Sequence, residues 1–110
     1  MDNDKLIGEL KSKLKTIITN SYKDLKPELE KDLNVFLETS REKLERWFTL
    51  SASGDITEEE LEWLIKSQLD LVTLQTLQTA GISKIRLNTL KNNIAKIIFK
   101  VILELIIPVV

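Results

Sequence analysis

Apolar residues recur at the α-helical period through the first half of the chain. Along this N-terminal stripe, eleven steps span forty residues, about 3.6 residues per turn, which is the period of an α-helix and not that of a left-handed coiled coil. One member of the stripe, Ser40, is polar, and the full set is Ile7, Leu10, Leu14, Ile18, Tyr22, Leu25, Leu29, Leu33, Phe36, Ser40, Leu44 and Trp47. The pattern predicts helix over residues 2–50.

Pro27 interrupts this predicted helix. A proline inside a helix lacks an N–H and clashes with the carbonyl four residues earlier, but it is tolerated in a first turn. Asn20, Ser21 and Asp24 precede it and are residue types that cap helices. The stripe nevertheless stays in phase across Pro27. The sequence therefore leaves open one kinked helix or two helices joined near residues 21–26, and it favours two.

A further helix begins after the loop at residues 51–54. Thr57 is a good N-cap residue, and Glu60 stands at the position that completes a capping box. Ile56 and Leu61 occupy the positions of a hydrophobic staple around the same helix start. We therefore expect this helix to begin at residue 57 or 58.

The same helix is predicted to have two apolar sides. One side carries Leu61, Leu64, Ile65, Leu69, Leu71 and Val72, and the other carries Trp63, Leu74 and Leu77. Because both sides are apolar, we expect this helix to have a central position in the fold. From Ser67 to Ser83 the only charged residue is Asp70. The neutral polar residues between them, such as Gln68, are expected to find hydrogen-bond partners across a helix contact.

Gly81 and Ser83 predict the turn of an αα-hairpin. Gly81 suits the residue after a helix end, and Ser83 suits the N-cap of the helix that follows. If the chain folds back at Gly81, residues whose numbers sum to about 162 face each other. This register would set Glu62 near Lys100 and match the acidic start of one helix to the basic end of the other.

The last helix is expected to run from Lys84 to Ile107, where Pro108 ends it. Lys96, Lys100 and Glu104 are spaced four apart on one side, and these charges argue against a membrane span, which needs about 20 apolar residues. Apolar residues cover more of this helix than the stripe of about 100° that faces a single neighbour. They form the candidate interface: Ile94, Ile97, Ile98, Phe99, Val101, Ile102, Leu105 and Ile106.

These patterns predict one all-α domain over residues 1–110. The expected architecture is an antiparallel bundle of three to four helices, made of an N-terminal helix kinked or broken near Pro27 followed by an αα-hairpin. The expected breaks lie near residues 21–27, 51–56 and 80–83.

The residue types present exclude several kinds of chemistry. The chain has no cysteine and no histidine, so it lacks disulfides, thiolate ligands and both the commonest general base and the commonest metal ligand. Residues 54–61 resemble the second half of an EF-hand calcium loop, but Thr49, Ser51 and Ser53 stand where acidic ligands belong. We therefore expect no catalytic residues, no metal site, no bound calcium and no cofactor.

Charge is distributed unevenly along the sequence. Residues 1–50 carry ten basic and ten acidic side chains, residues 51–83 carry one and six, and residues 84–110 carry five and one, for a net charge of -1. Because the domain has no basic excess, nucleic-acid binding is not expected. The polar residues that open the chain do not form a signal peptide, so a cytoplasmic location is expected.

The function predicted from these features is a non-catalytic protein-interaction or assembly module. We expect it to self-associate through the candidate interface of the last helix, because that helix has more apolar surface than one neighbour covers. Trp47 and Trp63 are candidate anchors for a partner, although packing at the end of the bundle beside the turn at residues 51–55 is the favoured explanation for them. The alternative is a peripheral membrane protein that turns Lys91, Lys96 and Lys100 towards anionic lipid.

Overall fold

The computed structural model describes residues 3–72 and 74–106 of the chain, and it is built from α-helices joined by short turns. The elements in order are α1 (Asn3–Ser21), the 3-10 helix η1 (Lys23–Leu25), α2 (Lys26–Ala52), α3 (Glu58–Leu71), α4 (Gln75–Thr79) and α5 (Lys84–Ile106). The all-α antiparallel bundle predicted from the sequence is confirmed.

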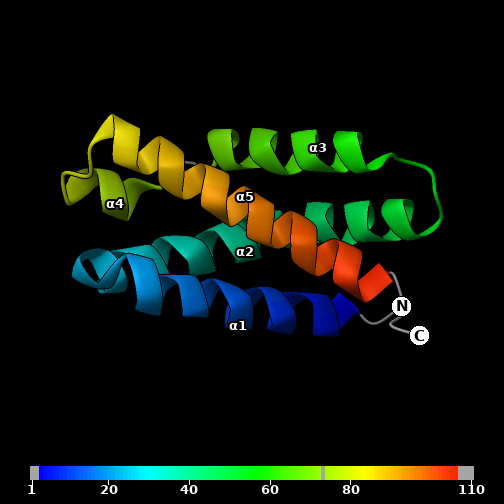
Figure 1. Cartoon of the computed structure of the whole chain (residues 1–110), viewed down its shortest axis with the longest axis horizontal. Helices are drawn as coiled ribbons and strands as arrows, with labels where there is room; N and C mark the ends of the chain where they lie inside the picture. Colours follow the sequence, from blue (N-terminus) through cyan, green and yellow to red (C-terminus); the bar gives the residue numbers. More distant parts are fainter. Residues whose placement is uncertain (1–2, 73, 107–110) are drawn as a thin grey trace.

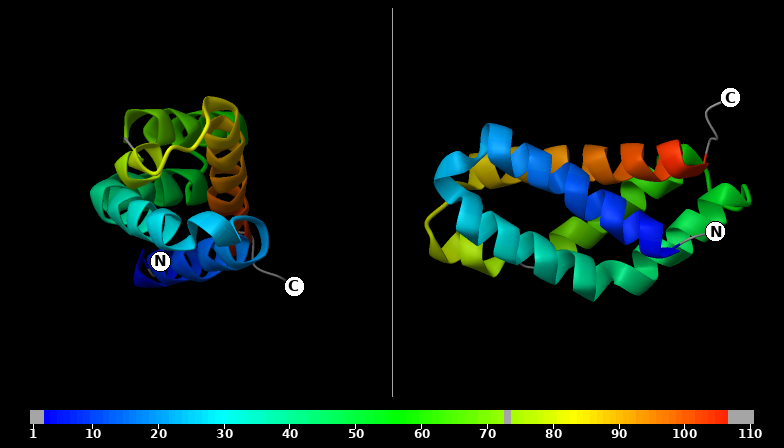
Figure 2. Two further views of the ribbon diagram at one scale, coloured as in Figure 1. Left: turned by 90° about the vertical axis from the view of Figure 1, so that its left-hand side faces the viewer. Right: turned by 90° about the horizontal axis from the view of Figure 1, so that it is seen from below.

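Four long helices form the bundle, and each is antiparallel to the two beside it (Figure 1). In cross-section α1 packs against α2 and α5, while α3 packs against the other sides of α2 and α5 (Figure 2). Because α5 also contacts α2 across the diagonal, it meets three long helices. The short helix α4 packs on α2 at one end, and all five α-helices contribute to a single apolar core.

The chain is broken, not kinked, before Pro27. Helix α1 ends at Ser21, the 3-10 turn follows, and α2 begins at Lys26, which puts Pro27 in a first turn where its missing N–H costs little. Eleven of the twelve residues of the N-terminal stripe are buried, and Leu25 in the turn is partly buried. The stripe stays in phase because the hairpin brings both helices onto the same core.

The predicted capping at this turn is wrong. Tyr22 and Leu25 occupy the cap positions, and neither caps with its side chain. Asp24 instead accepts two hydrogen bonds from the guanidinium of Arg86 in α5, at 2.7 and 2.8 Å. Arg86 also lies 5.5 Å from the ring centroid of Tyr22, and the Asn93 amide donates to the Tyr22 hydroxyl at 3.2 Å. These contacts attach the α1–α2 turn to α5.

The predicted start of α3 is confirmed at Thr57. The Glu60 N–H donates to Thr57 Oγ1 at 3.1 Å, and the Thr57 N–H donates to Glu60 Oε1 at 3.0 Å, which completes the capping box.

The turn before α5 also agrees with the prediction from the sequence. Gly81 has a φ of 87°, which favours glycine, and Ser83 Oγ accepts from the Arg86 N–H at 3.1 Å.

One break was not predicted, between α3 and α4. The helix expected to continue to about residue 80 ends at Leu71, and Val72 adopts extended backbone angles. Asp32 of α2 supplies the acceptors for the start of α4, since its carboxylate accepts the N–H groups of Thr76 and Leu77 at 3.1 and 2.8 Å. The predicted two-sided helix is therefore two helices, each with one buried side.

A buried polar contact explains why a serine stands in the apolar stripe. Ser40 is 0% exposed, and its hydroxyl accepts from the Gln68 side-chain amide of α3 at 3.0 Å. The Gln68 carbonyl oxygen in turn accepts from Lys43 Nζ at 3.2 Å. The expected hydrogen-bond partner for a buried glutamine is thus confirmed, and the pair fixes how α3 sits along α2.

The register of the C-terminal hairpin agrees with the predicted sum of about 162. Lys91 Nζ lies 3.6 Å from Asp70 Oδ1, and these residue numbers sum to 161. The predicted pairing of Glu62 with Lys100 is not found among the described residues. Glu62 pairs instead with Lys66 of its own helix, at 3.2 Å. The predicted helix end at Ile107 and Pro108 lies outside the described residues.

We predict that Asp32→Ala lowers the free energy of unfolding by about 1–3 kcal/mol, because two N–H groups at the start of α4 lose their acceptors. Urea denaturation followed by circular dichroism measures this loss. Glu42→Ala is the matched control, since it removes an exposed carboxylate from the same helix and should change stability by less than about 0.5 kcal/mol. Equal losses in the two variants would contradict the capping role.

The ion pair of Asp24 predicts a dependence on pH. The hydrogen bonds from Arg86 hold the pKa of the Asp24 carboxyl below its usual range. A carboxyl group whose pKa is lowered by folding contributes stability above its unfolded pKa and loses it as the pH falls through the folded value. Carboxyl NMR titration should therefore show Asp24 titrating below an ordinary aspartate, and Arg86→Gln should return it to the ordinary range. Identical midpoints in the two proteins would rule out this pairing in solution.

Candidate functional site

The surface predicted as an interface on α5 is largely filled by the chain itself. Ile94, Ile98, Val101 and Ile102 are buried in the core, and the other four candidates, Ile97, Phe99, Leu105 and Ile106, are partly buried against it. The sequence indicated that this surface needs more than one neighbour, and α5 has three long helices beside it within the chain. Self-association through this surface stays a prediction. Its broad apolar surface is covered within the monomer.

The two tryptophans predicted as anchors lie in different environments. Trp47 is 9% exposed and belongs to the core, so it is not available to a partner. Trp63 is 66% exposed on the outer side of α3. The two rings therefore do not form one site, and only Trp63 remains a candidate anchor.

Acidic side chains surround Trp63 on its helix. Glu59 and Glu60 precede it by one turn, Glu62 is adjacent, and Asp70 follows two turns later. Because α-helical neighbours are three or four residues apart, Glu59, Glu60 and Asp70 share the outer side of α3 with the indole ring, and Glu62 lies at the edge of that side. We call this set the α3 surface: Glu59, Glu60, Glu62, Trp63, Lys66 and Asp70.

The lysines predicted to contact lipid are also divided by the structure. Lys91 Nζ lies 3.6 Å from Asp70 Oδ1, and the Lys91 side chain is only 19% exposed, so it is less accessible to a ligand than the other two lysines. Lys96 and Lys100 are exposed on the outer side of α5 and are spaced by one helical turn. These two remain available to a ligand in solvent.

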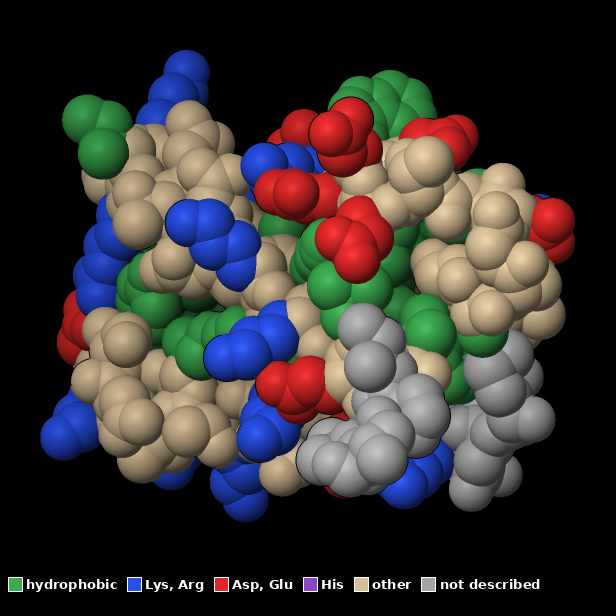
Figure 3. Space-filling model, turned by 45° about the vertical axis from the view of Figure 1, so that its right-hand side comes forward, with side chains coloured by type: hydrophobic (Ala, Val, Ile, Leu, Met, Phe, Trp, Pro, Cys, Tyr) green, Lys and Arg blue, Asp and Glu red, His purple; other side chains and the backbone are tan. Residues whose placement is uncertain are grey.

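Folding separates charge into two layers. The neighbouring helices α1 and α5 carry nine basic and three acidic residues, a formal excess of six positive charges. The opposite neighbours α2 and α3 carry six basic and eleven acidic residues, a formal excess of five negative charges. In Figure 3 acidic side chains gather in the upper part, over α3, and most lysine and arginine side chains lie lower or to the left.

This separation was missed by charge counts along the sequence. The first 50 residues are neutral in sum, but they fold into α1 and α2, which belong to opposite layers. The signal was present in the helix at residues 3–21, which has four basic and two acidic residues. It becomes informative only when the helix neighbours are known.

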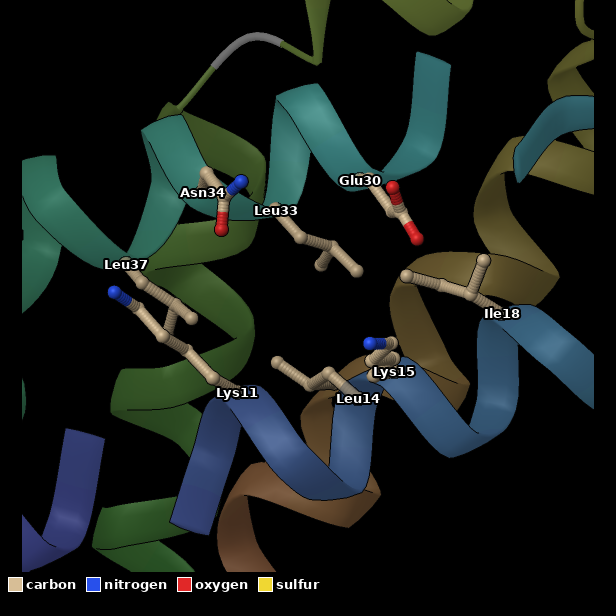
Figure 4. Close-up of a pocket in the computed structure, with 8 residues that line it drawn as sticks. All are labelled: Lys11, Leu14, Lys15, Ile18, Glu30, Leu33, Asn34 and Leu37. Atoms are coloured by element: carbon tan, nitrogen blue, oxygen red, sulfur yellow. The ribbon is translucent and has the colours of Figure 1, made fainter. Parts of the chain in front are cut away.

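Two of the grooves between helices are formed by α1 with one of its neighbours. The groove between α1 and α2 has a volume of about 230 Å³, and its four buried floor residues are leucine and isoleucine (Figure 4). It is lined by Lys11, Leu14, Lys15, Ile18, Glu30, Leu33, Asn34 and Leu37. Its rim has Lys11 and Lys15 from α1 opposite Glu30 and Asn34 from α2. Lys11 Nζ also lies 3.8 Å from Glu38 Oε1, so one of the two cations at this rim is already paired.

The second groove lies between α1 and α5, within the basic layer, and has a volume of about 210 Å³. It is lined by Lys13, Thr16, Ile17, Ile97, Lys100, Val101 and Glu104. Val101 is buried, Ile17 and Ile97 are partly buried, and both lysines are exposed at the rim. The groove therefore offers apolar contact flanked by positive charge.

The described residues hold neither a cluster of metal ligands nor a helix that could span a membrane. In residues 3–72 and 74–106, no group of three or more Asp, Glu, His or Cys side chains is placed to hold a metal ion. The buried carboxylate of Asp32 is occupied by the N–H groups of α4. Among the helices of the same described residues, none has the length and apolarity required to cross a bilayer.

The chain matches no protein-family model, no curated protein and no solved structure.

Proposed function

We propose that the protein is a non-catalytic interaction module that binds a basic, amphipathic protein segment on its α3 surface. The observation that carries the proposal is the position of Trp63, a large aromatic side chain that is 66% exposed on an ordered helix. Tryptophan is enriched among the residues that dominate binding energy at protein interfaces. A partner that covers this ring would remove a large apolar area from water.

The helix that carries Trp63 is well anchored. Its start is fixed by the capping box of Thr57 and Glu60, and its inner side buries Leu61, Ile65 and Leu69 with 1% exposure or less. A side chain on such a helix is presented to a partner with little loss of backbone freedom. This preorganisation lowers the entropic cost of binding.

The charge around Trp63 indicates the chemistry of the partner. Helix α3 carries five acidic residues and one basic residue, Lys66, which is paired with Glu62 at 3.2 Å. A segment with lysine or arginine beside an apolar side chain complements this surface. The carboxylates would steer the segment and set its orientation, while contact with the indole would supply most of the affinity.

We predict that a synthetic helical peptide of lysine and leucine binds the protein, and that a glutamate and leucine peptide of equal length does not. Calorimetry should show that Trp63→Ala weakens binding of the basic peptide by about tenfold or more, because the ring is the central apolar contact. Ile85→Ala is the matched control. It truncates a side chain that is 82% exposed on α5 and should leave binding unchanged.

Two results would contradict this proposal. One is binding of both peptides with similar affinity, and the other is an equal effect of Trp63→Ala and Ile85→Ala. A concentration-dependent increase in mass that Trp63→Ala abolishes would identify a second copy of the chain as the occupant and would overturn the assignment of a separate basic partner. Circular dichroism of each variant establishes that the bundle is retained.

A further inference from the structure

The groove between α1 and α5 combines two kinds of side chain. Ile17 and Ile97 form a partly exposed apolar strip with Val101 beneath it, and Lys13 and Lys100 lie at the rim, one from each helix. No aromatic residue lines the groove. The site is thus suited to a ligand that presents negative charge next to hydrocarbon.

Among the residues that the structure describes, the ammonium groups at this rim have no ion-pair partner. Among the described residues, no carboxylate lies within 4.0 Å of the ammonium group of Lys13, Lys96 or Lys100. Other cations are paired, including Lys66 with Glu62 and Arg86 with Asp24, at 3.2 and 2.7 Å. In the described part of the chain, Glu104 is the one acidic residue that lines the groove. The net rim charge is therefore positive and open to solvent.

We propose that the α1/α5 layer is a docking surface for an anionic lipid membrane. Lys13, Lys96 and Lys100 would contact lipid phosphates, and Ile17 with Ile97 would contact the adjoining acyl chains. The bilayer interface presents phosphate and hydrocarbon side by side, which matches the pairing of charge and apolar surface in this groove. The formal excess of six positive charges on α1 and α5 supplies the attraction at longer range.

The composition of the groove favours lipid over nucleic acid. Single strands are bound mainly by stacking of bases on aromatic side chains, and the lining of this groove is aliphatic. The arrangement also leaves the proposed protein-binding surface accessible. Helices α1 and α3 occupy opposite corners of the bundle, so a membrane on the α1/α5 layer and a protein on the α3 surface can be bound together (Figure 2).

The test is co-sedimentation of the full chain with vesicles of phosphatidylcholine alone and of phosphatidylcholine mixed with phosphatidylglycerol. We expect binding only to the mixed vesicles, with a decrease as the ionic strength rises. Lys13→Gln and Lys100→Gln should each lower the partition coefficient about fivefold. Glu104→Gln should raise it, because it removes the acidic side chain that repels the lipid phosphates.

The double variant Lys26→Gln with Lys31→Gln is the matched control for Lys13→Gln with Lys100→Gln. Both pairs remove two exposed lysines and change net charge equally, but the control pair lies on α2 in the other layer. The control should retain most of the binding. Equal loss in the two double variants, no preference for phosphatidylglycerol, or binding to a DNA duplex in place of vesicles would overturn the proposal.

Because the lysines are exposed, the variants should retain the helical circular dichroism of the parent. The same salt series on the unsubstituted chain gives a second test that needs no variant. This proposal is independent of the peptide-binding function. Trp63→Ala should leave vesicle binding unchanged, and Lys13→Gln with Lys100→Gln should leave binding of the basic peptide intact or slightly stronger.

Discussion

The wide apolar side of α5 has to be covered, and the other helices are arranged around it. Leu90, Ile98 and Ile102 are 0% exposed because α1, α2 and α3 each contact this helix. Full burial of an aliphatic side chain contributes about 1.5–3 kcal/mol, whereas a typical hydrogen bond contributes about 1 kcal/mol. Apolar burial therefore contributes more stability per side chain than these hydrogen bonds do, and the turn before Pro27 is what returns α1 to cover α5.

Several arrangements of the helices would bury the same apolar area, and polar contacts between helices select one of them. Ser40 bonds to Gln68 between α2 and α3, Asp32 holds α4 on α2, and Asp24 holds the first turn to α5. Each of these contacts joins elements that are distant in sequence. A sliding of α3 or α4 along α2 would leave Ser40, Gln68 or Asp32, which are buried, without a partner, and this costs about 1–3 kcal/mol. Such contacts define register even where they add little net stability.

The parts of the fold that could be predicted are those with local signals. The capping box at Thr57, the glycine at residue 81 and the 3.6-residue stripe act over a few residues, so the sequence is sufficient to locate them. The break after Leu71 could not be found in this way. No proline or glycine marks it, and the acceptor that stabilises α4 belongs to Asp32, more than forty residues earlier.

The candidate surfaces required knowledge of helix neighbours for the same reason. The sequence identified Trp63, Lys96 and Lys100, but it could not show that Trp47 is buried or that Lys91 is paired with Asp70. It also overestimated the apolar surface left on the last helix, because a helical pattern reports the width of an apolar side and not the number of neighbours that cover it. The contribution of α1 to the basic groove appears only once α1 is seen beside α5.

The central claim is that α5 is covered by its own chain, which leaves the α3 surface and the α1/α5 layer to act on other molecules. Absolute mass by light scattering, measured over a wide range of protein concentration in buffer without detergent, tests it most directly. The account predicts a mass of 12.7 kDa, that of one chain, throughout the range. A fixed dimer or larger assembly at the lowest concentration would contradict it, because that result would mean that the apolar side of α5 is completed by another copy.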